Sequence, residues 1–348
     1  MTLQLDVKMG IRNLNHYLRT NCPDSIRCVN ASELSGKRIA VDISIYLYKY
    51  EADNSLLENM YTMLTIFEYY NIIPIFIFDG KPPPEKKALL IKRRENRQEA
   101  QNEFNKLKEQ LKNLEQTNMQ DDDKHEMTDK QDIIDAMDQL KKQIVQITQE
   151  KIQSVKALIR AFGATYYDAP GEADELCALL VSKKKVWACL SEDMDLFVYG
   201  CTRVLRYFSL IGHTVVLYYF KGILDELKIT QQEFKEICIL SGTDYNINNS
   251  GQHYTNNLKQ TMGHFKKYKD SKLTDKSFYN WIVLNVEGYI TNMDLLVKIN
   301  KMFDLNVEHE SIQHFKNVKI ANGPVLQDEI EKIMIPENFI FVKSNKLN

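Results

Sequence analysis

The sequence predicts an α/β fold with a central parallel sheet, a projecting helical hairpin and a helical C-terminal region. Three short apolar runs, at residues 38–42, 72–79 and 186–193, are expected to be buried strands. Their apolar character is continuous rather than alternating, so helices should cover both faces of the sheet. Between the second and third runs, residues 85–162 contain neither glycine nor proline, which is typical of long helices.

Composition indicates an ordinary soluble globular protein. The 348 residues are 44% hydrophobic and 26% charged, and the net charge of −2 gives no indication of a nucleic-acid partner. The six cysteines form no Cys-x-x-Cys pair, which disfavours zinc and favours reduced, buried thiols. No signal peptide and no membrane-spanning run is visible, so an intracellular protein without a membrane partner is expected. It should be nuclear in a eukaryotic cell and cytoplasmic if viral.

Each of the three predicted strands ends in an acid. Asp42, Asp79 and Asp193 follow the apolar runs directly. In parallel sheets the ligand site lies beyond the carboxyl ends of the strands, so these acids should meet there. A single aspartate after a strand is more often a helix cap, and the convergence of several acids is what favours a site.

Four further acids belong to the same pattern. Asp195 lies two residues after Asp193, in a segment where both can face the same way, and Asp244 follows a predicted helix. Glu172 and Asp174 open another helix, and within a helix their spacing would separate them by ~200°. Glu172 is therefore expected to precede the helix or to lie at its end. The alternative is that this pair only complements the helix dipole.

The proposed ligand set consists of oxygen donors alone. Crowded carboxylates repel one another unless cations lie among them, and hard oxygen ligands select Mg²⁺ or Mn²⁺. Two such ions ~4 Å apart would suit phosphodiester hydrolysis. The seven predicted metal ligands are Asp42, Asp79, Glu172, Asp174, Asp193, Asp195 and Asp244.

The stretch from Glu85 to Phe162 predicts a helical hairpin. A polar break at residues 117–123 separates two apolar stripes, and Thr128 with Gln131 matches a capping box that would restart the helix. A coiled-coil dimerisation insert remains an equal alternative. The stripes comprise Phe104, Leu107, Leu111 and Leu114, then Ile133, Met137, Leu140, Ile144 and Ile147.

Downstream of the third run, residues 203–208 and 214–220 predict a strand pair. Thr230 should cap a helix that reaches about Leu240 and ends at Gly242.

Six motifs occur in the order seen in flap endonucleases, within the wider group of XPG-type structure-specific 5′ nucleases. They are MGIRNL at 9–14, IAVD at 39–42, FIFDGKPP at 76–83, DAPGEAD at 168–174, SEDMD at 191–195 and LSGTDY at 240–245. The resemblance covers residues 9–245 and implies a PIN-like fold with two Mg²⁺ ions, replaceable by Mn²⁺, on the seven acids. Asp174 stands where flap endonucleases usually have Glu, although the exonuclease branch resembles this sequence in having Asp.

The resemblance also implies roles for residues outside the acid set. Lys86 and Arg93 match the arch residues that face the scissile phosphate, whereas the residues alone would suggest a solvated charged face. Tyr48 matches a tyrosine that stacks on a base, with core packing as its alternative. The hairpin resembles the arch through which a single-stranded 5′ end passes, but its tip, Asp121–Asp123, is acidic.

The C-terminal region departs from the family. Residues 246–254 (NINNSGQHY) largely lack the glycine turn of the duplex-binding helix-turn-helix, so the domains expected are a nuclease core over 9–245, with an arch insert at 84–160, and a degenerate helical region over 246–348. No sliding-clamp motif is visible at the C-terminus. The lysines expected to contact phosphates are Lys259, Lys266, Lys267 and Lys269, followed by Lys272 and Lys276.

The expected function is that of a monomeric nuclease in DNA repair or replication. It would cut DNA with 5′ flaps or single-stranded 5′ ends, with 5′→3′ exonuclease activity in addition. Two alternatives remain open: a ribonuclease on the same fold, and a silent nucleic-acid-binding regulator. Retention of all seven acids disfavours the silent protein, because an idle acid cluster would destabilise the fold.

Overall fold

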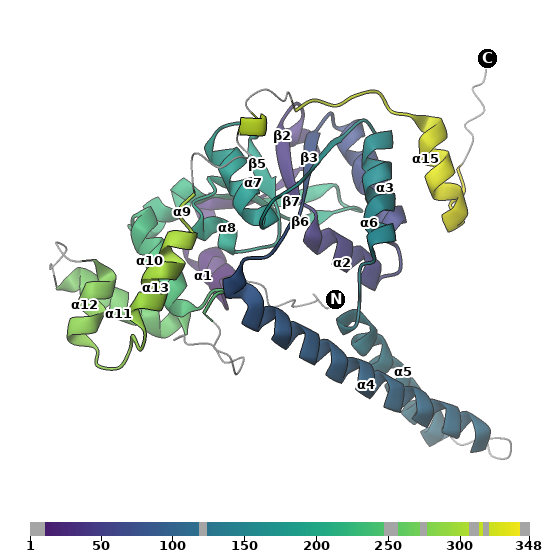
Figure 1. Cartoon of the computed structure of the whole chain (residues 1–348), viewed down its shortest axis with the longest axis horizontal. Helices are drawn as coiled ribbons and strands as arrows, with labels where there is room; N and C mark the ends of the chain where they lie inside the picture. Colours follow the sequence, from purple (N-terminus) through teal and green to yellow (C-terminus); the bar gives the residue numbers. More distant parts are fainter. Residues whose placement is uncertain are drawn as a thin grey trace.

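A seven-stranded sheet forms the centre of the protein, and helices cover both of its faces (Figure 1). The computed structural model describes residues 11–117, 124–246, 257–271, 277–305, 313–315 and 320–341. The strand order is β1-β7-β6-β5-β2-β3-β4. Within the described part of the chain, no helix is long and apolar enough to cross a membrane.

The parallel part of the sheet confirms the three predicted strands. They correspond to β2 (Arg38–Asp42), β3 (Ile73–Phe78) and β5 (Ala188–Leu190). β2 pairs in parallel with β3 and β5, β4 (Thr165–Asp168) pairs with β3, and β6 (Arg203–Ser209) pairs with β5. Three carboxyl ends carrying predicted acids therefore lie at one edge.

The other end of the sheet is antiparallel, so the sheet as a whole is mixed. The predicted strand pair is β6 and β7 (Thr214–Tyr219), which are antiparallel, and β1 (Ile26–Asn30) pairs antiparallel with β7. A connection as short as that between β6 and β7 can join only antiparallel strands. The edge strands β1 and β4 were not predicted, because both are half-exposed and lack a continuous apolar run.

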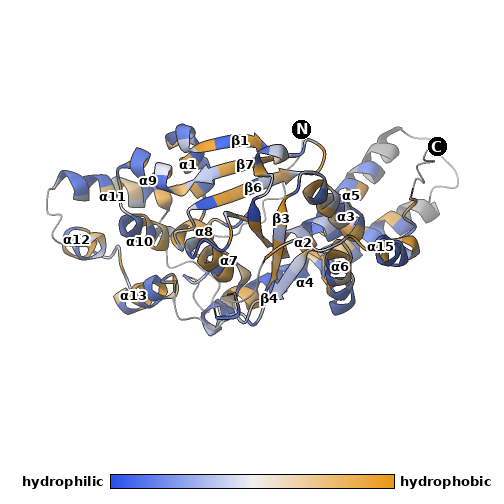
Figure 2. Ribbon diagram, turned by 90° about the horizontal axis from the view of Figure 1, so that it is seen from above, coloured by the Kyte–Doolittle hydropathy of each residue, from blue (hydrophilic) through white to orange (hydrophobic). Residues whose placement is uncertain are grey.

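The core lies on both faces of the sheet, as the continuous apolar strands require. Phe76 packs on one face with Phe67, whereas its neighbours Ile75 and Ile77 join the cluster on the other face. Figure 2 shows that hydrophobic residues concentrate in the strands and on the inner sides of the helices.

The helices divide between the two faces. One face is covered by α1 (Leu14–Asn21), α7 (Ala173–Ser182), α8 (Asp195–Val198), α9 (Phe220–Leu227) and α10 (Gln231–Ser241). The other is covered by α2 (Ser44–Ala52), α3 (Leu56–Tyr69), α6 (Gln149–Ala161) and α15 (Gln327–Met334). Short 3₁₀ turns lie at η1 (Pro23–Ser25), η2 (Ala31–Leu34), η3 (Pro84–Lys86) and η4 (Ile335–Glu337).

The predicted hairpin is present and projects from the sheet as α4 (Lys87–Thr117) and α5 (Lys124–Gln143) (Figure 1). These helices pack against each other within the chain. The predicted stripe residues on them are half-buried: Phe104, Leu107, Leu111, Ile133, Met137 and Leu140. The acidic tip, Asp121–Asp123, lies outside the described residues.

Two details of the hairpin prediction are wrong. The second helix begins at Lys124, before the predicted cap at Thr128. It also ends at Gln143 rather than continuing past Ile147. No glycine or proline marks this break, but the Thr148 side chain accepts a hydrogen bond from Lys151 N and starts α6. Ile147 packs against the core, so burial of one apolar side chain and one cap favour the break.

The C-terminal region divides between two places. The helices α11 (Leu258–Asp270), α12 (Phe278–Asn285) and α13 (Met293–Met302) lie beside α10, whose capping box at Thr230 is confirmed. Residues 320–341 return to the core, where α15 packs on α6. Gly323 N donates to Gly163 O at 2.7 Å, and a Cβ at Gly163 would lie 2.4 Å from Gly323 O. The predicted domain division at 245/246 stays a prediction.

Candidate metal centre

The strand-end acids lie at the carboxyl edge of the parallel strands. Asp42 ends β2, Asp79 follows β3, and Asp193 follows β5. Glu172 is the N-cap residue of α7, outside the helix, as its spacing from Asp174 predicted. Asp195 begins α8, and Asp244 follows the C-cap of α10.

Hydrogen bonds from neighbouring loops orient the carboxylates. Ser191 Oγ donates to Asp42 Oδ2 at 2.8 Å, and Ala173 N donates to Asp79 Oδ1 at 2.8 Å. Ser44 contacts both acids, through its backbone N–H to Asp42 and its hydroxyl to Asp79. These contacts join β2, β3, β5 and the start of α7 into one site.

The loop after β3 reaches α7 because of one glycine. Gly80 N donates to Gly171 O at 2.7 Å. A Cβ at Gly80 would lie 1.9 Å from Ala169 O, so any other residue would force the two loops apart. Gly80 therefore allows Asp79 to accept the hydrogen bond from the first residue of α7.

Two cations from the base of the arch reach into the acid cluster. Lys86 is 8% exposed, and its Nζ lies 2.5 Å from Glu172 Oε1 and 3.7 Å from Asp244 Oδ2. Arg93 Nη2 lies 2.9 Å from the same Asp244 oxygen. The alternative of a solvated charged face is therefore wrong for Lys86.

Burial and mutual repulsion raise the pKa values of carboxyl groups in the cluster. Burial, together with the charge of Asp79, raises the pKa of Asp42 to about 7. Burial and neighbouring acids also raise the pKa values of Asp174, Asp193 and Asp195. Burial disfavours the charged form of Lys86, but the surrounding carboxylates outweigh it and raise the pKa of its amine. The cluster thus carries excess negative charge that favours cations.

The donor set suits a hard divalent cation. It consists of carboxylate oxygens, and Asp195 Oδ1 is buried without a hydrogen-bond partner. Among the described residues, however, no three His, Cys, Asp or Glu side chains form a ready-made ligand group. Lys86 and Arg93 pair with Glu172 and Asp244. To bind metal, these two acids would have to release the side-chain cations and coordinate metal ions in their place.

Sequence reasoning missed the role of Tyr245. Its hydroxyl donates to Glu172 Oε2 at 2.5 Å, and Lys86 Nζ lies 5.5 Å from its ring centroid. The ring also packs against Phe303, beyond the end of α13. Its position after Asp244 was a signal, but its contact with Glu172, 73 residues away, was not visible in the sequence.

The predicted nucleic-acid-binding residues lie on the surface, but one of them, Lys269, is already paired with an acid. Tyr48 on α2 is 47% exposed, so the alternative of core packing is wrong. Lys259, Lys266 and Lys267 are exposed on α11. Lys269 Nζ instead lies 2.8 Å from Glu233 Oε1 in the capping box of α10. Lys272, Lys276 and most of the altered turn, residues 247–254, lie outside the described residues.

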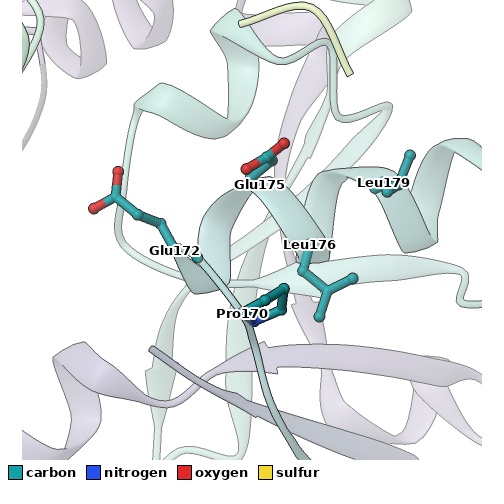
Figure 3. Close-up of a pocket in the computed structure, with 6 residues that line it drawn as sticks. Pro170, Glu172, Glu175, Leu176 and Leu179 are labelled. Carbon is teal, nitrogen blue, oxygen red and sulfur yellow. The ribbon is translucent and has the colours of Figure 1, made fainter. Parts of the chain in front are cut away.

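A small hollow lies beside the site at the start of α7. Figure 3 shows Glu172 and Glu175 with their carboxylates pointing in different directions, above Pro170 and Leu176. Gly171 and Leu179 complete the lining. The hollow contains only one of the seven predicted ligands, so it does not mark the centre of the cluster.

The raised pKa values predict an unusual pH dependence for the protein in chelator. A carboxyl whose folded pKa exceeds its ordinary value of about 4 contributes stability at low pH and loses it as pH rises. For Asp42 this loss extends to about pH 7. We expect a lower unfolding midpoint at pH 7.5 than at pH 5, measured by thermal denaturation in EDTA. Asp42→Asn should flatten this dependence.

The matched control for this pH experiment is Asp168→Asn, since Asp168 ends β4 but pairs with Lys156. It should leave the pH dependence unchanged. Equal midpoints for the wild type at the two pH values would contradict the proposed repulsion within the cluster.

Comparison with known protein families gives two matches. The XPG N-terminal domain matches residues 9–100, and the XPG I-region matches residues 163–244. Together they cover half of the chain. Their two segments contain all seven predicted acids, and the arch lies largely between them.

Curated relatives agree with these matches. Flap endonuclease 1-A of Sorghum bicolor is 32% identical over 256 residues, which are 68% of this chain and 62% of that relative. Flap endonuclease 1 of Glossina morsitans morsitans is 29% identical over 256 residues, 68% of this chain and 61% of the relative. The chain therefore spans about three fifths of the length of these relatives.

Solved structures share the fold. The catalytic core of Rad2 in complex with DNA substrate superposes with a TM-score of 0.59 at 19% identity, covering 94% of this chain and 95% of that chain. Flap endonuclease-1 from Methanococcus jannaschii gives a TM-score of 0.58 at 21% identity, covering 94% and 93%. The sheet and its flanking helices are thus those of the PIN-like nuclease fold. The ordered motifs, the two family matches and the relatives together establish that this chain belongs to the flap endonuclease and XPG-type nuclease family.

Proposed function

We propose that this protein is a metal-dependent nuclease that hydrolyses phosphodiester bonds in flapped or branched DNA. It acts at 5′ flaps and also removes nucleotides from single-stranded 5′ ends. The observation that carries the proposal is the buried carboxylate cluster, into which Lys86 and Arg93 reach from the base of the arch. A cluster of acids attracts metal ions, and cations beside it attract phosphate.

The seven acids would hold two Mg²⁺ ions, which Mn²⁺ could replace. These ions would supply an activated water and charge stabilisation for the leaving oxygen. The fit rests on the all-oxygen donor set and on the unpartnered Asp195 Oδ1. Related structures support the choice of metal, since the Holliday junction-resolving enzyme GEN1 is described in complex with product DNA and Mg²⁺ ion.

The other residues of the site act on the substrate. In the free protein Lys86 and Arg93 neutralise Glu172 and Asp244. On substrate binding these cations would transfer to the scissile phosphate and stabilise the charge that develops there. Tyr245 would hold Glu172 while Lys86 leaves it, and Tyr48 would stack on a base beside the cut.

The hairpin would act within a single chain. α4 and α5 bury their apolar stripes against each other, which leaves no described stripe for a coiled-coil partner. We therefore propose a monomer whose arch admits the single-stranded 5′ end of DNA. We further propose that it works inside the cell, in the nucleus of a eukaryote or the cytoplasm if viral, in repair or replication.

A substrate panel tests the proposed function. The rates on a 5′ flap, a nicked duplex, single-stranded DNA and the matching RNA strand should be compared in Mg²⁺, Mn²⁺ and EDTA. We expect the 5′ flap to be cut fastest with either metal and no cleavage in EDTA. Faster cleavage of RNA would favour the ribonuclease, and binding without cleavage on every substrate would favour the silent regulator.

The duplex should be held by phosphate contacts from α11. Each phosphate contact adds ~0.9 to the slope of log affinity against log salt. Replacing Lys266 and Lys267 together by alanine should therefore lower that slope by about two, equally on all sequences. Fluorescence anisotropy with a labelled duplex at several salt concentrations measures it.

Lys269 is the matched control for this salt titration. Because Glu233 already neutralises it, Lys269→Ala should change the slope little, although it lies on the same helix. A loss of slope as large as that of the double variant would mean that DNA displaces Glu233 and that the ion pair does not persist.

A further inference from the structure

A buried arginine outside the set of seven acids contacts the loop that carries Asp193. Arg206, on β6, is 5% exposed. Its Nη2 donates to Glu192 O at 2.7 Å, and its Nη1 lies 2.8 Å from Met194 Sδ. The guanidinium therefore touches both neighbours of Asp193. The Asp193 carboxylate between them interacts instead with Asp244, Lys86 and Glu172.

A bulge in β6 adds a second contact to the same loop. The pairing of β6 with β7 shifts register between Arg206 and Ser209, and Tyr207 has a φ of 59°. This turns Tyr207 N toward Glu192, where it donates to Oε1 at 2.5 Å. The other carboxylate oxygen lies 3.6 Å from Arg206 Nε. A left-handed backbone conformation costs free energy at a non-glycine residue. Here it places Tyr207 N where it donates a hydrogen bond to the buried Glu192 carboxylate.

The network extends to the first helix. Arg206 Nη1 also donates to Asn15 Oδ1 at 2.9 Å, and Tyr218 OH donates to the same oxygen at 2.7 Å. Asn15 Nδ2 in turn donates to Tyr207 OH at 2.7 Å. Asn15 lies on α1. The network around Arg206 therefore links α1, the strands β6 and β7, and the 191–195 loop.

We infer that Arg206 is a positioning residue that fixes Asp193 and Asp195 for metal binding by holding the loop through Glu192 and Met194. This rests on the proposed metal-dependent function. The fork of a guanidinium donates to a carbonyl and an amide oxygen at once while its charge lies beside the Glu192 carboxylate, which a lysine cannot do. In the described contacts Arg206 does not reach the seven acids themselves, and it would act on them through Glu192 and Met194.

Metal binding, measured separately from cleavage, tests the inference. The probe is Mn²⁺, titrated by electron paramagnetic resonance into the full chain without DNA. Arg206→Lys keeps the charge beside Glu192 but loses the fork, and we expect Mn²⁺ to bind roughly tenfold more weakly, as for other outer residues that orient metal ligands. The metal concentration for half-maximal cleavage should rise by the same factor, while DNA affinity in EDTA stays unchanged.

Two further variants complete the test, one in case the single substitution prevents folding and one as a matched control. The double variant Arg206→Met/Glu192→Gln removes both buried charges, so it should fold even if a lone change does not, and it should also bind Mn²⁺ more weakly. Arg203→Met is the matched control on the same strand, because Arg203 stacks on Trp187 and Tyr219 and has no contact with the 191–195 loop among those the structure gives. Its Mn²⁺ affinity should equal that of the wild type.

The outcomes separate this inference from the proposed function. If the wild type binds Mn²⁺ and both Arg206 variants bind it equally well, the inference is overturned, even if their unfolding midpoints fall. That result would mean a purely structural role. If the wild type itself binds no Mn²⁺, the proposed metal-dependent function fails, and the inference fails with it.

Discussion

Replacing Asp193 by alanine should lower the rate of cleavage by roughly three orders of magnitude or more, a loss of about 4 kcal/mol of transition-state stabilisation. Asp193 is 8% exposed and lies at the centre of the cluster. Burial and the charge of Asp244 raise its pKa, and Asp195 N donates to its Oδ1 at 2.9 Å. A carboxylate buried among other acids is costly for the fold, which is what we expect of a group kept to bind metal.

Asp79→Ala should show the same loss from a different position. Asp79 is exposed and bridges Ser44 and the start of α7, so its removal would take away a predicted ligand at an exposed position. Both variants should still bind flapped DNA in EDTA, because the basic residues that contact phosphate remain. Single-turnover cleavage and anisotropy titrations measure the two properties separately.

The control for both aspartate variants is Asp168→Ala. Asp168 also ends a strand of the sheet, but its carboxylate pairs with Lys156. Its cleavage rate should stay within a few-fold of the wild type. A near-normal rate for Asp193→Ala or Asp79→Ala would remove that residue from the metal site.

The second large effect concerns the two arch cations. Lys86→Ala and Arg93→Ala should each slow the chemical step by about 10²–10³-fold, as removal of one charged or hydrogen-bonding group at a reacting centre does elsewhere. A cation that reaches the scissile phosphate acts mainly in the transition state, so DNA affinity should fall much less. In the free protein these side chains lie within 4 Å of Asp244, next to the expected position of the phosphate.

Neighbouring residues give matched controls for the arch variants. Lys87 and Arg94 are exposed and carry the same charges one residue further along the chain. Alanine at either position should affect the chemical rate little, since neither has an ion pair with the acids among the described contacts. If Lys86→Ala and Arg93→Ala lose affinity but keep the rate at saturating enzyme, the two residues only bind the DNA backbone.

The sequence by itself determined three strands of the parallel part of the sheet, β2, β3 and β5, and the acids at or just after their ends. The apolar runs that became β2, β3 and β5 are long enough to be buried on both faces, and hydrophobic burial of this kind is a local property of the chain. Similarly, the capping box at Thr230 and the stop at Gly242 fixed α10, because caps depend on residues only a few positions apart.

The sequence also restricted Glu172 to a place before its helix or at the helix end, and the structure has it before the helix, as the N-cap residue. It did not predict the break between α5 and α6. There the gain from burying Ile147 exceeded the helix propensity of its neighbours.

Only the tertiary structure decided which side chains meet across the site. Glu172 contacts Lys86 and Tyr245, which are 86 and 73 residues away along the chain. Arg206 and Asn15, which are also in contact, are 191 residues apart. The bulge at Tyr207 and the pairing of β1 with β7 likewise have no local signature. Such contacts form because a buried charged group needs a partner to offset the loss of solvation. Which partner lies within reach depends on the packing of the whole chain and not on spacing along it.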